Sequence, residues 1–453
     1  MRNSHKIEVL TLTKAEFGSS YAFRDMAKRH IIEEGNWELI FGRVLELVMA
    51  NSGEDPFPEV FKILVAKLYS EATDRRQLYR VCIRSDDPVG QFSALLQKVN
   101  AHWKNILGED LDPKLDGEHL RACLQPLADY SLLDGSFEAL DGALEFVVSR
   151  SSKNIRGQYF TPRHVVHLCV EALNPQPGEL VADPACGSGG FLVHALQHMR
   201  EQAEEGAEDN AAKSIWGFDY DERSTRLARA LMIMAGDGHT NIFTANSLRR
   251  PQSNMFDFVK DSHLGIEDCL RGRLKNFKGF DVILTNPPFA GEIRETSILT
   301  EYELAEGKKS IERDVLFVER CIELLKPGGR MAIVLPNNKL AGTKFSGLRH
   351  WILKRARIDY VVSLGRNTFL PHTHQKSEIL FCTKRDVGRD LSRDEAILFA
   401  VSDREGKDSK GRIVRKEDAP KNAATWDTAD HDLAEILLEM KKFRTSNKTK
   451  SAK

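Results

Sequence analysis

The sequence predicts an α/β fold, in which a helical N-terminal domain precedes a Rossmann-like, seven-stranded, mostly parallel sheet wrapped by helices. Residues 1–145 repeat their apolar side chains at helical spacing, as in Trp37–Met49 and Phe61–Tyr69, and show no strand alternation. From about residue 146, short apolar runs alternate with helical patterns. This rhythm is typical of parallel strands that are connected by crossover helices.

The predicted strands are short apolar runs bounded by polar or turn-forming residues. They lie at residues 179–182, 214–218, 241–244, 280–285, 330–335, 359–364 and 378–382. Helical patterns at residues 189–202, 222–235 and 315–325 separate the first five runs, and Lys326-Pro-Gly-Gly is a helix stop. We expect the last strand to be reversed, and we assign residues 146–400 to this domain.

The remaining part of the sequence, residues 401–453, is more polar. A further predicted strand, at 396–401, leads into this part and precedes a polar loop at 403–421. An amphipathic pattern at 432–443 predicts a short helix, and the basic end from Lys441 to Lys453 is expected to fray. We interpret this tail as a segment that can dock a partner.

Composition excludes several classes of protein. Apolar residues make up 41% and charged residues 29% of the sequence, as in ordinary globular proteins. Because no apolar run is long enough to span a membrane and no secretory h-region is present, we expect a cytoplasmic protein without membrane contact. The seven cysteines form no C-x-x-C pair, which argues against a disulfide framework, and we predict no metal site.

The charge balance gives a mixed message about nucleic acid. The net charge of −1 lacks the basic excess of a stand-alone nucleic-acid binder. Basic side chains nevertheless gather within residues 344–357 and in the C-terminal tail. A solvated helix face and a frayed end explain this clustering equally well.

The first strong motif is Val181-Ala-Asp-Pro-Ala-Cys-Gly-Ser-Gly-Gly-Phe191, where a predicted strand turns into a helix. Its glycines allow a tight turn and the close approach of a ligand to the backbone, at the positive end of the helix dipole. Asp183, at the carboxyl end of the strand, can accept hydrogen bonds from a ligand amine. A glycine-rich turn alone fits a dinucleotide site equally well, but the whole string is more specific. The predicted ligand-binding residues of this motif are Asp183, Ala185, Gly187, Ser188, Gly189 and Gly190.

A second acidic residue, Asp219, ends the next predicted strand. A carboxylate there can bind both ribose hydroxyls of an adenosine. The alternative is that Asp219 caps the following helix, although Asp221 can serve as that cap instead.

The decisive string is Thr285-Asn-Pro-Pro-Phe289, directly after an apolar strand. An aromatic amine is a poor nucleophile, because its lone pair is delocalised into the ring. The side-chain oxygen of Asn286 and the carbonyl of Pro287 can each accept one N–H of that amine, which aims the nitrogen lone pair at a methyl group. Pro287 and Pro288 stiffen the loop, and Phe289 offers a face on which a flipped-out base can stack.

With these motifs in order, residues 140–385 resemble the modification (methyltransferase) subunits of type I restriction–modification systems, which are gamma-class DNA N6-adenine methyltransferases. The resemblance implies the class I S-adenosylmethionine-dependent methyltransferase fold. It also implies S-adenosylmethionine as cofactor and adenine in double-stranded DNA as target. Asn286 would then lie beside the cofactor as well as the base.

Two further segments resemble the family. Gly157-Gln-Tyr-Phe-Thr-Pro-Arg163 is similar to the segment that contacts the methionine part of the cofactor. It adds Gln158, Tyr159, Phe160 and Thr161 to the implied cofactor site. The stretch from Leu364 to Leu380 resembles a late motif, in which Phe369 would face the target base beside Phe289. His372 and His374 in this stretch are interpreted as polar loop groups.

This sequence also departs from the family pattern. The third strand ends in Ala245-Asn-Ser-Leu248, where the family usually has an acidic residue for the adenine of the cofactor. Asn246 can still accept from an amine, and with Ser247 it completes the implied cofactor site. Fewer than 70 residues follow Lys384, so we expect no target-recognition domain. The resemblance therefore implies a separate specificity (S) subunit, and leaves open whether a restriction (R) subunit completes the system.

Other functions remain as alternatives. Enzymes that methylate a glutamine amide in release factors, or guanine N2 in RNA, also use an Asn-Pro-Pro-aromatic loop, but usually with Tyr and without the G-Q-Y-F-T-P segment. A non-catalytic, cofactor-binding defence module is a second alternative, against which the intact Asp183 and Asn286 argue. A nicotinamide dehydrogenase is a third, but the glycine string lacks the G-x-G-x-x-G order.

Overall fold

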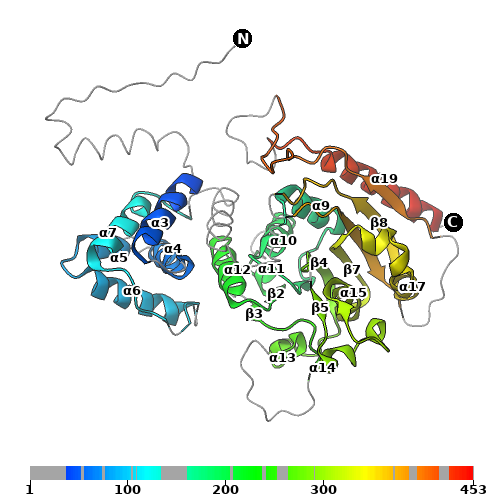
Figure 1. Ribbon diagram of the computed structural model, residues 1–453, viewed down its shortest axis with the longest axis horizontal. Helices are drawn as coiled ribbons and strands as arrows, with labels where there is room; N and C mark the ends of the chain where they lie inside the picture. Colours follow the sequence, from blue (N-terminus) through cyan, green and yellow to red (C-terminus); the bar gives the residue numbers. More distant parts are fainter. Residues whose placement is uncertain are drawn as a thin grey trace.

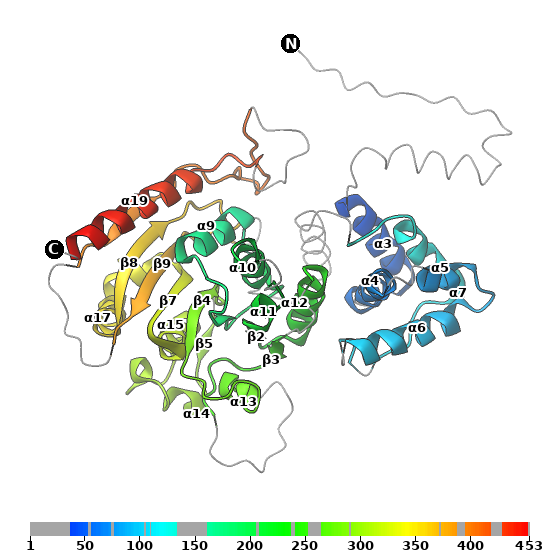
Figure 2. The ribbon, with the colours of Figure 1, turned by 180° about the vertical axis from the view of Figure 1, so that it is seen from behind.

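The protein forms a group of helices beside a helix-covered sheet (Figures 1 and 2). The computed structural model describes residues 37–52, 56–73, 77–103, 106–108, 110–133, 161–204, 208–236, 241–251, 264–289, 291–370, 373–386, 395–417 and 428–451. The predicted helical character of the N-terminal region is confirmed within its described part, 37–133. The predicted domain boundaries remain predictions.

The N-terminal helices pack around buried side chains such as Phe41, Leu64 and Phe92. Two of them begin at aspartate caps, because Asp87 accepts from the N–H of residue 90 and Asp116 from those of residues 118 and 119. The helices are α3 (Trp37–Ser52), α4 (Phe57–Ala72), α5 (Gln77–Arg84), α6 (Pro88–His102), α7 (Gly117–Leu124) and the short η1 (Gln125–Leu127).

The sheet has eight strands in the order β10-β8-β9-β7-β4-β1-β2-β3. All neighbours pair in parallel except β9, which is antiparallel to both β7 and β8, so the predicted reversed strand is confirmed. The strands are β1 (Val181–Asp183), β2 (Ile215–Asp219), β3 (Ile242–Thr244), β4 (Phe280–Thr285), β7 (Leu325–Pro336), β8 (Ala356–Ser363), β9 (Ser377–Lys384) and β10 (Leu398–Val401).

The prediction of seven strands was wrong by one. The apolar run at 396–401 contributes β10, which pairs in parallel with β8 at the edge of the sheet. Leu398 and Ala400 pack against the core below the sheet, while Phe399 and Val401 point outward and are exposed. The strand forms because alternate side chains find an apolar surface beside β8.

Helices cover both faces of the sheet, which explains why its strands read as continuous apolar runs. Side chains alternate between two cores, so Val282 and Leu284 of β4 enter one core and Ile283 enters the other. One face is covered by α9 (Arg163–Leu173), α10 (Gly190–Glu201), α12 (Glu222–Met234) and α19 (Leu433–Ser451). The other is covered by α13 (Ile266–Leu270), α14 (Thr296–Leu299), α15 (Arg313–Leu324) and α17 (Ser346–Arg355).

Smaller elements connect these layers. They are α11 (Glu208–Lys213), α16 (Asn338–Ala341), η3 (Glu303–Ala305), η4 (Thr343–Phe345) and an antiparallel pair of two-residue strands, β5 (Glu292–Ile293) and β6 (Ile311–Glu312).

The C-terminal helix corrects a second prediction, because α19 continues to Ser451 through the segment that was expected to fray. Its first half packs on α9 and β10, with Leu433 and Met440 buried. Lys441 then pairs with Glu171 of α9 at 2.9 Å. Once a packed half has formed, each further residue adds one backbone hydrogen bond, and the helix propagates.

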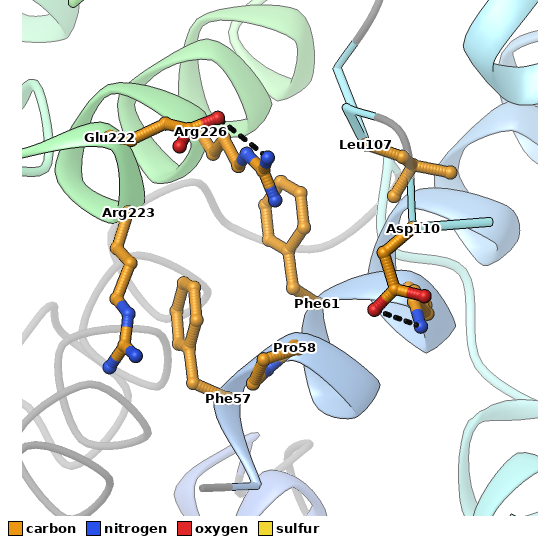
Figure 3. A pocket seen from close by; sticks show the side chains of 9 residues that line it. Phe57, Pro58, Phe61, Leu107, Asp110, Glu222, Arg223 and Arg226 are labelled. Carbon is orange, nitrogen blue, oxygen red and sulfur yellow. Dashed lines mark hydrogen bonds and ion pairs between the residues drawn. The ribbon is translucent and has the colours of Figure 1, made fainter. Parts of the chain in front are cut away.

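The helical group meets the sheet domain where α4 faces the start of α12 (Figure 3). A cavity of about 140 Å³ lies there. The stacked rings of Phe57 and Phe61, 5.7 Å apart, line it from α4, and Arg223 and Arg226 line it from α12. Gly108 has a positive φ of 70°, and a Cβ there would lie 2.4 Å from a guanidinium nitrogen of Arg226. The left-handed backbone at Gly108 therefore favours a glycine at this joint.

No helix within the described ranges is both long and apolar enough to cross a bilayer. The same ranges contain no group of three His, Cys, Asp or Glu side chains arranged to hold a metal ion. All seven cysteines are buried and free, in agreement with the argument against a disulfide framework.

Candidate active site

The glycine loop joins β1 to α10 at the carboxyl edge of the sheet. Gly187 and Gly189 both adopt positive φ angles, 52° and 90°. A Cβ on Gly189 would lie 3.1 Å from the Cβ of Ala228, so this glycine lets α10 and α12 pack closely. A Cβ on Gly187 would meet nothing within 4 Å among the residues that the structure describes. The backbone at Gly187 is therefore open to a ligand.

Asp219 binds the glycine loop directly. One carboxylate oxygen accepts from the N–H of Gly187 and the other from the N–H of Asp221, both at 2.9 Å. Burial raises the pKa of Asp219 to about 6, against the effect of these N–H groups. The alternative in which Asp219 caps the next helix was wrong, because Asp221 caps α12 by accepting from the N–H of Ser224 at 3.0 Å.

Asp183 lies beneath the loop and is 1% exposed. Its Oδ1 accepts from the N–H of Ala185 at 3.0 Å. Burial raises the pKa of Asp183 to about 7, and the nearby charge of Asp219 adds to this effect. The two carboxylates of the predicted cofactor site are thus close enough to influence each other.

The turn after β3 is tied to the same loop. The Ser247 hydroxyl donates to the carbonyl of Pro184 at 2.5 Å. The Asn246 side chain, predicted to accept from the cofactor, accepts from the N–H of Leu248 within its own turn at 3.1 Å. The structure therefore brings Asp183, Asp219 and Ser247 together around one loop.

Two residues that the sequence did not single out hold this turn from the other side. Arg320 of α15 is 2% exposed and donates to the carbonyl of Ser247 at 2.8 Å. The Tyr302 hydroxyl donates to the carbonyl of Leu248 at 2.7 Å. A signal existed for Arg320, since the Glu319–Arg320 pair interrupts the apolar pattern of a helix that packs on the sheet.

Asn286 follows β4 at the same edge. Its Nδ2 donates to the Thr161 hydroxyl at 3.0 Å. Its Oδ1 is buried and has no hydrogen-bond partner in the described part of the protein. Pro287 is buried and Pro288 is half-buried. One half of the Asn286 amide is therefore held by the protein, whereas the acceptor half is unused.

Phe289 and Phe369 lie together, with ring centroids 5.7 Å apart and planes at 76°. Phe289 is half-buried, whereas Phe369 is 1% exposed. Phe289 is thus the ring that a base can reach in this conformation, and Phe369 packs against it edge-on.

Part of the predicted site falls outside the described residues. These are Gln158, Tyr159, Phe160 and His372. Thr161, the fourth residue that the same segment adds to the implied cofactor site, is described, and its hydroxyl accepts from Asn286.

A comparison with protein families now decides the class of this protein. The model of the N-6 DNA Methylase family matches residues 138–448. The chain belongs to this family. The match spans the whole sheet, including the glycine loop and the Asn-Pro-Pro-Phe loop, and it extends into α19.

Relatives of known function are similar to this N-6 DNA methylase over part of their length. The type I restriction enzyme EcoEI methylase subunit of Escherichia coli is 30% identical over 232 residues, which is 50% of this chain and 42% of that protein. The EcoKI methylase subunit of Escherichia coli K12 is 28% identical over 241 residues, or 53% and 42% of the two chains. The resemblance to type I subunits is confirmed, although the match spans less than half the length of these relatives.

Solved structures show the same fold. A modification subunit of a putative type I restriction enzyme from Vibrio vulnificus has a TM-score of 0.61 and 21% identity, covering 86% of this chain and 88% of that one. The type I methyltransferase subunit from Streptococcus thermophilus has a TM-score of 0.63 and 16% identity, covering 90% and 93%. The predicted methyltransferase fold class is confirmed.

The basic stretch at 344–357 is largely engaged in ion pairs of this N-6 DNA methylase. Lys344 pairs with Glu312 at 2.8 Å, and Arg357 with Asp359 at 2.7 Å. Arg355 contacts Glu303. These contacts favour a solvated helix face over a dedicated nucleic-acid surface.

Proposed function

We propose that this protein is the modification subunit of a type I restriction–modification system. In this proposal it transfers a methyl group from S-adenosylmethionine to the N6 amine of an adenine flipped out of double-stranded DNA. A specificity subunit selects the sequence. The family and the curated type I relatives support the reaction class.

The observation that carries the proposal is the unused acceptor of Asn286. Its Oδ1 is buried without a partner in the described structure, and its Nδ2 is held by Thr161. A buried acceptor without a partner costs about 1–3 kcal/mol, and a planar amine in the site would relieve that cost. Because the Asn286 amide is already oriented, its Oδ1 can accept a hydrogen bond from an N6–H group without reorganisation.

We call the side of the carboxyl edge around Asn286 and Phe289 the base half, and the side around Gly187 and Asp219 the cofactor half. The cofactor half fits an adenosine-containing cofactor. The open backbone at Gly187 allows close approach, and Asp219 is partly accessible beside it. Asp183, Ala185, Ser188, Gly189, Gly190, Asn246 and Ser247 are the remaining described residues that we assign to this half. When bound, the cofactor supplies an electrophilic methyl group on a sulfonium.

The protein contributes positioning and fixed dipoles to the reaction. Asn286 Oδ1 and the Pro287 carbonyl would each accept a hydrogen bond from one N6–H group, which would turn the nitrogen lone pair towards the methyl group. Methyl transfer to this nitrogen would leave it with one surplus proton, which would pass to solvent. Phe289 stacks on the base and keeps it out of the duplex.

Partners and location follow from this role. The relatives are named as subunits of type I restriction enzymes, which supports a specificity subunit and, in a complete system, a restriction subunit. A substrate of chromosomal DNA assigns the protein to the cytoplasm.

The test is a transfer assay with product analysis. Purified protein is incubated with radiolabelled S-adenosylmethionine and host-free genomic DNA, alone and after co-expression with its neighbouring genes. We expect label in N6-methyladenine, lost in Asn286→Ala and retained in Asn338→Ala, a control at an exposed asparagine. Cofactor binding without labelled DNA in either preparation, or label in RNA or protein instead, would contradict the proposal.

A further inference from the structure

A segment that follows the sheet reaches back to the base-facing half of the site. This arm, residues 402–407, comes directly after β10 and is fixed to the start of α19. The hydroxyl of Ser402 donates to Asp432 at 2.6 Å, and the N–H groups of Asp403 and Arg404 donate to the same carboxylate at 2.7 and 3.1 Å. One aspartate therefore fastens three consecutive residues of the arm.

Two side chains of the arm hold the loop 364–370 on either side of Phe369. Glu405 accepts from the N–H of Asn367 at 3.1 Å, and Lys407 donates to the carbonyl of Leu370 at 2.7 Å. Glu405 also lies against Gly365, where a Cβ would come within 1.8 Å of its carboxylate. No larger residue fits at position 365 while Glu405 keeps this contact.

The loop transmits this contact to the base-stacking ring. Phe369 is almost fully buried, and its edge meets the ring of Phe289 at a centroid distance of 5.7 Å. A buried aromatic ring cannot move without displacing its neighbours, because protein interiors are close-packed. Displacement of the loop backbone at residues 367 or 370 therefore shifts Phe289.

The arm region also touches the support of Asn286. His431, which bridges to Glu405, stacks on His164 with ring centroids 4.9 Å apart. His164 lies in the first turn of α9, three residues after Thr161, whose hydroxyl holds the Asn286 amide. Both described supports of the base half, Thr161 and Phe369, are thus connected to one segment.

We propose that Glu405 and Lys407 are positioning residues for the target base, which hold the loop around Phe369 so that Phe289 is set to stack on a flipped adenine. This inference rests on the proposed function. It adds a link between the start of α19 and the base-facing half of the site.

The experiment measures kcat, the KM for host-free genomic DNA and the cofactor Kd in the assembled enzyme. Glu405→Ala and Lys407→Met should each lower kcat/KM for DNA by about tenfold, because small displacements of a positioning group have large effects on rate. The cofactor Kd should stay within about twofold, since the glycine-loop half is untouched. Glu405→Gln and Lys407→Arg keep the acceptor and the donor and should restore most of the activity.

The matched control is Arg412→Met, just beyond the arm. It breaks the exposed ion pair with Asp408 and should leave kcat/KM unchanged. A double-mutant cycle separates positioning from general loosening. In a Phe369→Leu background, Lys407→Met should add little further loss, because it acts through that ring. Fully additive losses, or Glu405 and Lys407 variants as active as Arg412→Met, would overturn the inference. A wild-type enzyme that methylates no DNA would instead overturn the proposed function.

Discussion

The two halves of the carboxyl edge are built differently. In the cofactor half, polar groups already have protein partners: Asp219 accepts from Gly187 and Asp221, and Ser247 donates to Pro184. In the base half, the Oδ1 acceptor of Asn286 is buried and has no hydrogen-bond partner among the described residues. In the cofactor half, a ligand therefore adds contacts to groups that are already hydrogen-bonded. In the base half, the substrate would supply the hydrogen bond that Asn286 Oδ1 lacks.

The largest effect should follow from removing that acceptor. Asn286→Ala deletes a preorganised dipole aimed at the reacting amine, and such losses reduce kcat by about 10²–10³-fold. Single-turnover methyl transfer to genomic DNA measures it. Asn338→Ala removes an exposed asparagine beside β7 and should leave the rate unchanged. If Asn286→Ala kept the wild-type rate of methyl transfer, the acceptor of Asn286 would not contribute to the reaction.

A backbone change in the other half should act on binding. Gly187→Asp places a side chain and a negative charge in the open space above the loop, at a φ of 52°. We expect cofactor affinity to fall by about tenfold or more, equivalent to about 1.4 kcal/mol. Gly272→Asp is matched, because Gly272 also has a positive φ of 78° and open space around it. Equal losses in both variants would point to backbone strain rather than to a ligand site.

The buried carboxylates of the cofactor half predict a pH dependence. The pKa of Asp183 is raised to about 7 and that of Asp219 to about 6, from an ordinary value of 3.8. The folded protein therefore binds more protons than the unfolded protein between these limits, and the contribution of these groups to stability is lost as the pH rises from about 4 to 7.

Urea unfolding of the free protein at about pH 5 and about pH 8 checks this dependence. Asp183→Asn removes one of the two titrating groups and should reduce the loss of stability between the two pH values. Asp112→Asn, at an exposed aspartate, should keep it. An unchanged slope in Asp183→Asn would show that its carboxyl is not perturbed.

A last effect, on stability alone, concerns the outer support of the cofactor half. Tyr302→Phe removes the donor to the Leu248 carbonyl, a bond of 2.7 Å in a buried setting. The free energy of unfolding should fall by about 1–3 kcal/mol, because a buried carbonyl is left without its partner. Thermal denaturation measures it, with Tyr220→Phe as the control at a tyrosine that is 64% exposed. A Tyr302→Phe variant as stable as that control would show that the hydrogen bond from Tyr302 does not stabilise the turn after β3.

The local motifs were the part of the site that could be predicted from sequence. Asp183, Gly187 and Asn286 lie in short strings whose chemistry is contained in a few consecutive residues after a strand. The reversal of β9 was also predicted, and the strand is antiparallel to both of its neighbours.

What escaped prediction depends on contacts between distant residues. Arg320 and Ser247 are 73 positions apart, and no local sequence pattern predicts the hydrogen bond between them. Phe369 was expected to face the base, but its burial behind Phe289 follows from the packing of a loop that only the folded protein defines. The strand at 396–401 was predicted, but its parallel pairing with β8 as an eighth strand of the sheet was not.

We therefore infer that the cofactor half binds S-adenosylmethionine, whereas the base half promotes methyl transfer. The most direct test of this division is the cofactor Kd of Asn286→Ala, measured by calorimetry beside wild type and Gly187→Asp. We expect a Kd for Asn286→Ala within about threefold of wild type, whereas Gly187→Asp should lose about tenfold or more in cofactor affinity. An equal loss of cofactor binding in both variants would contradict the division, because the two halves would then form a single binding surface.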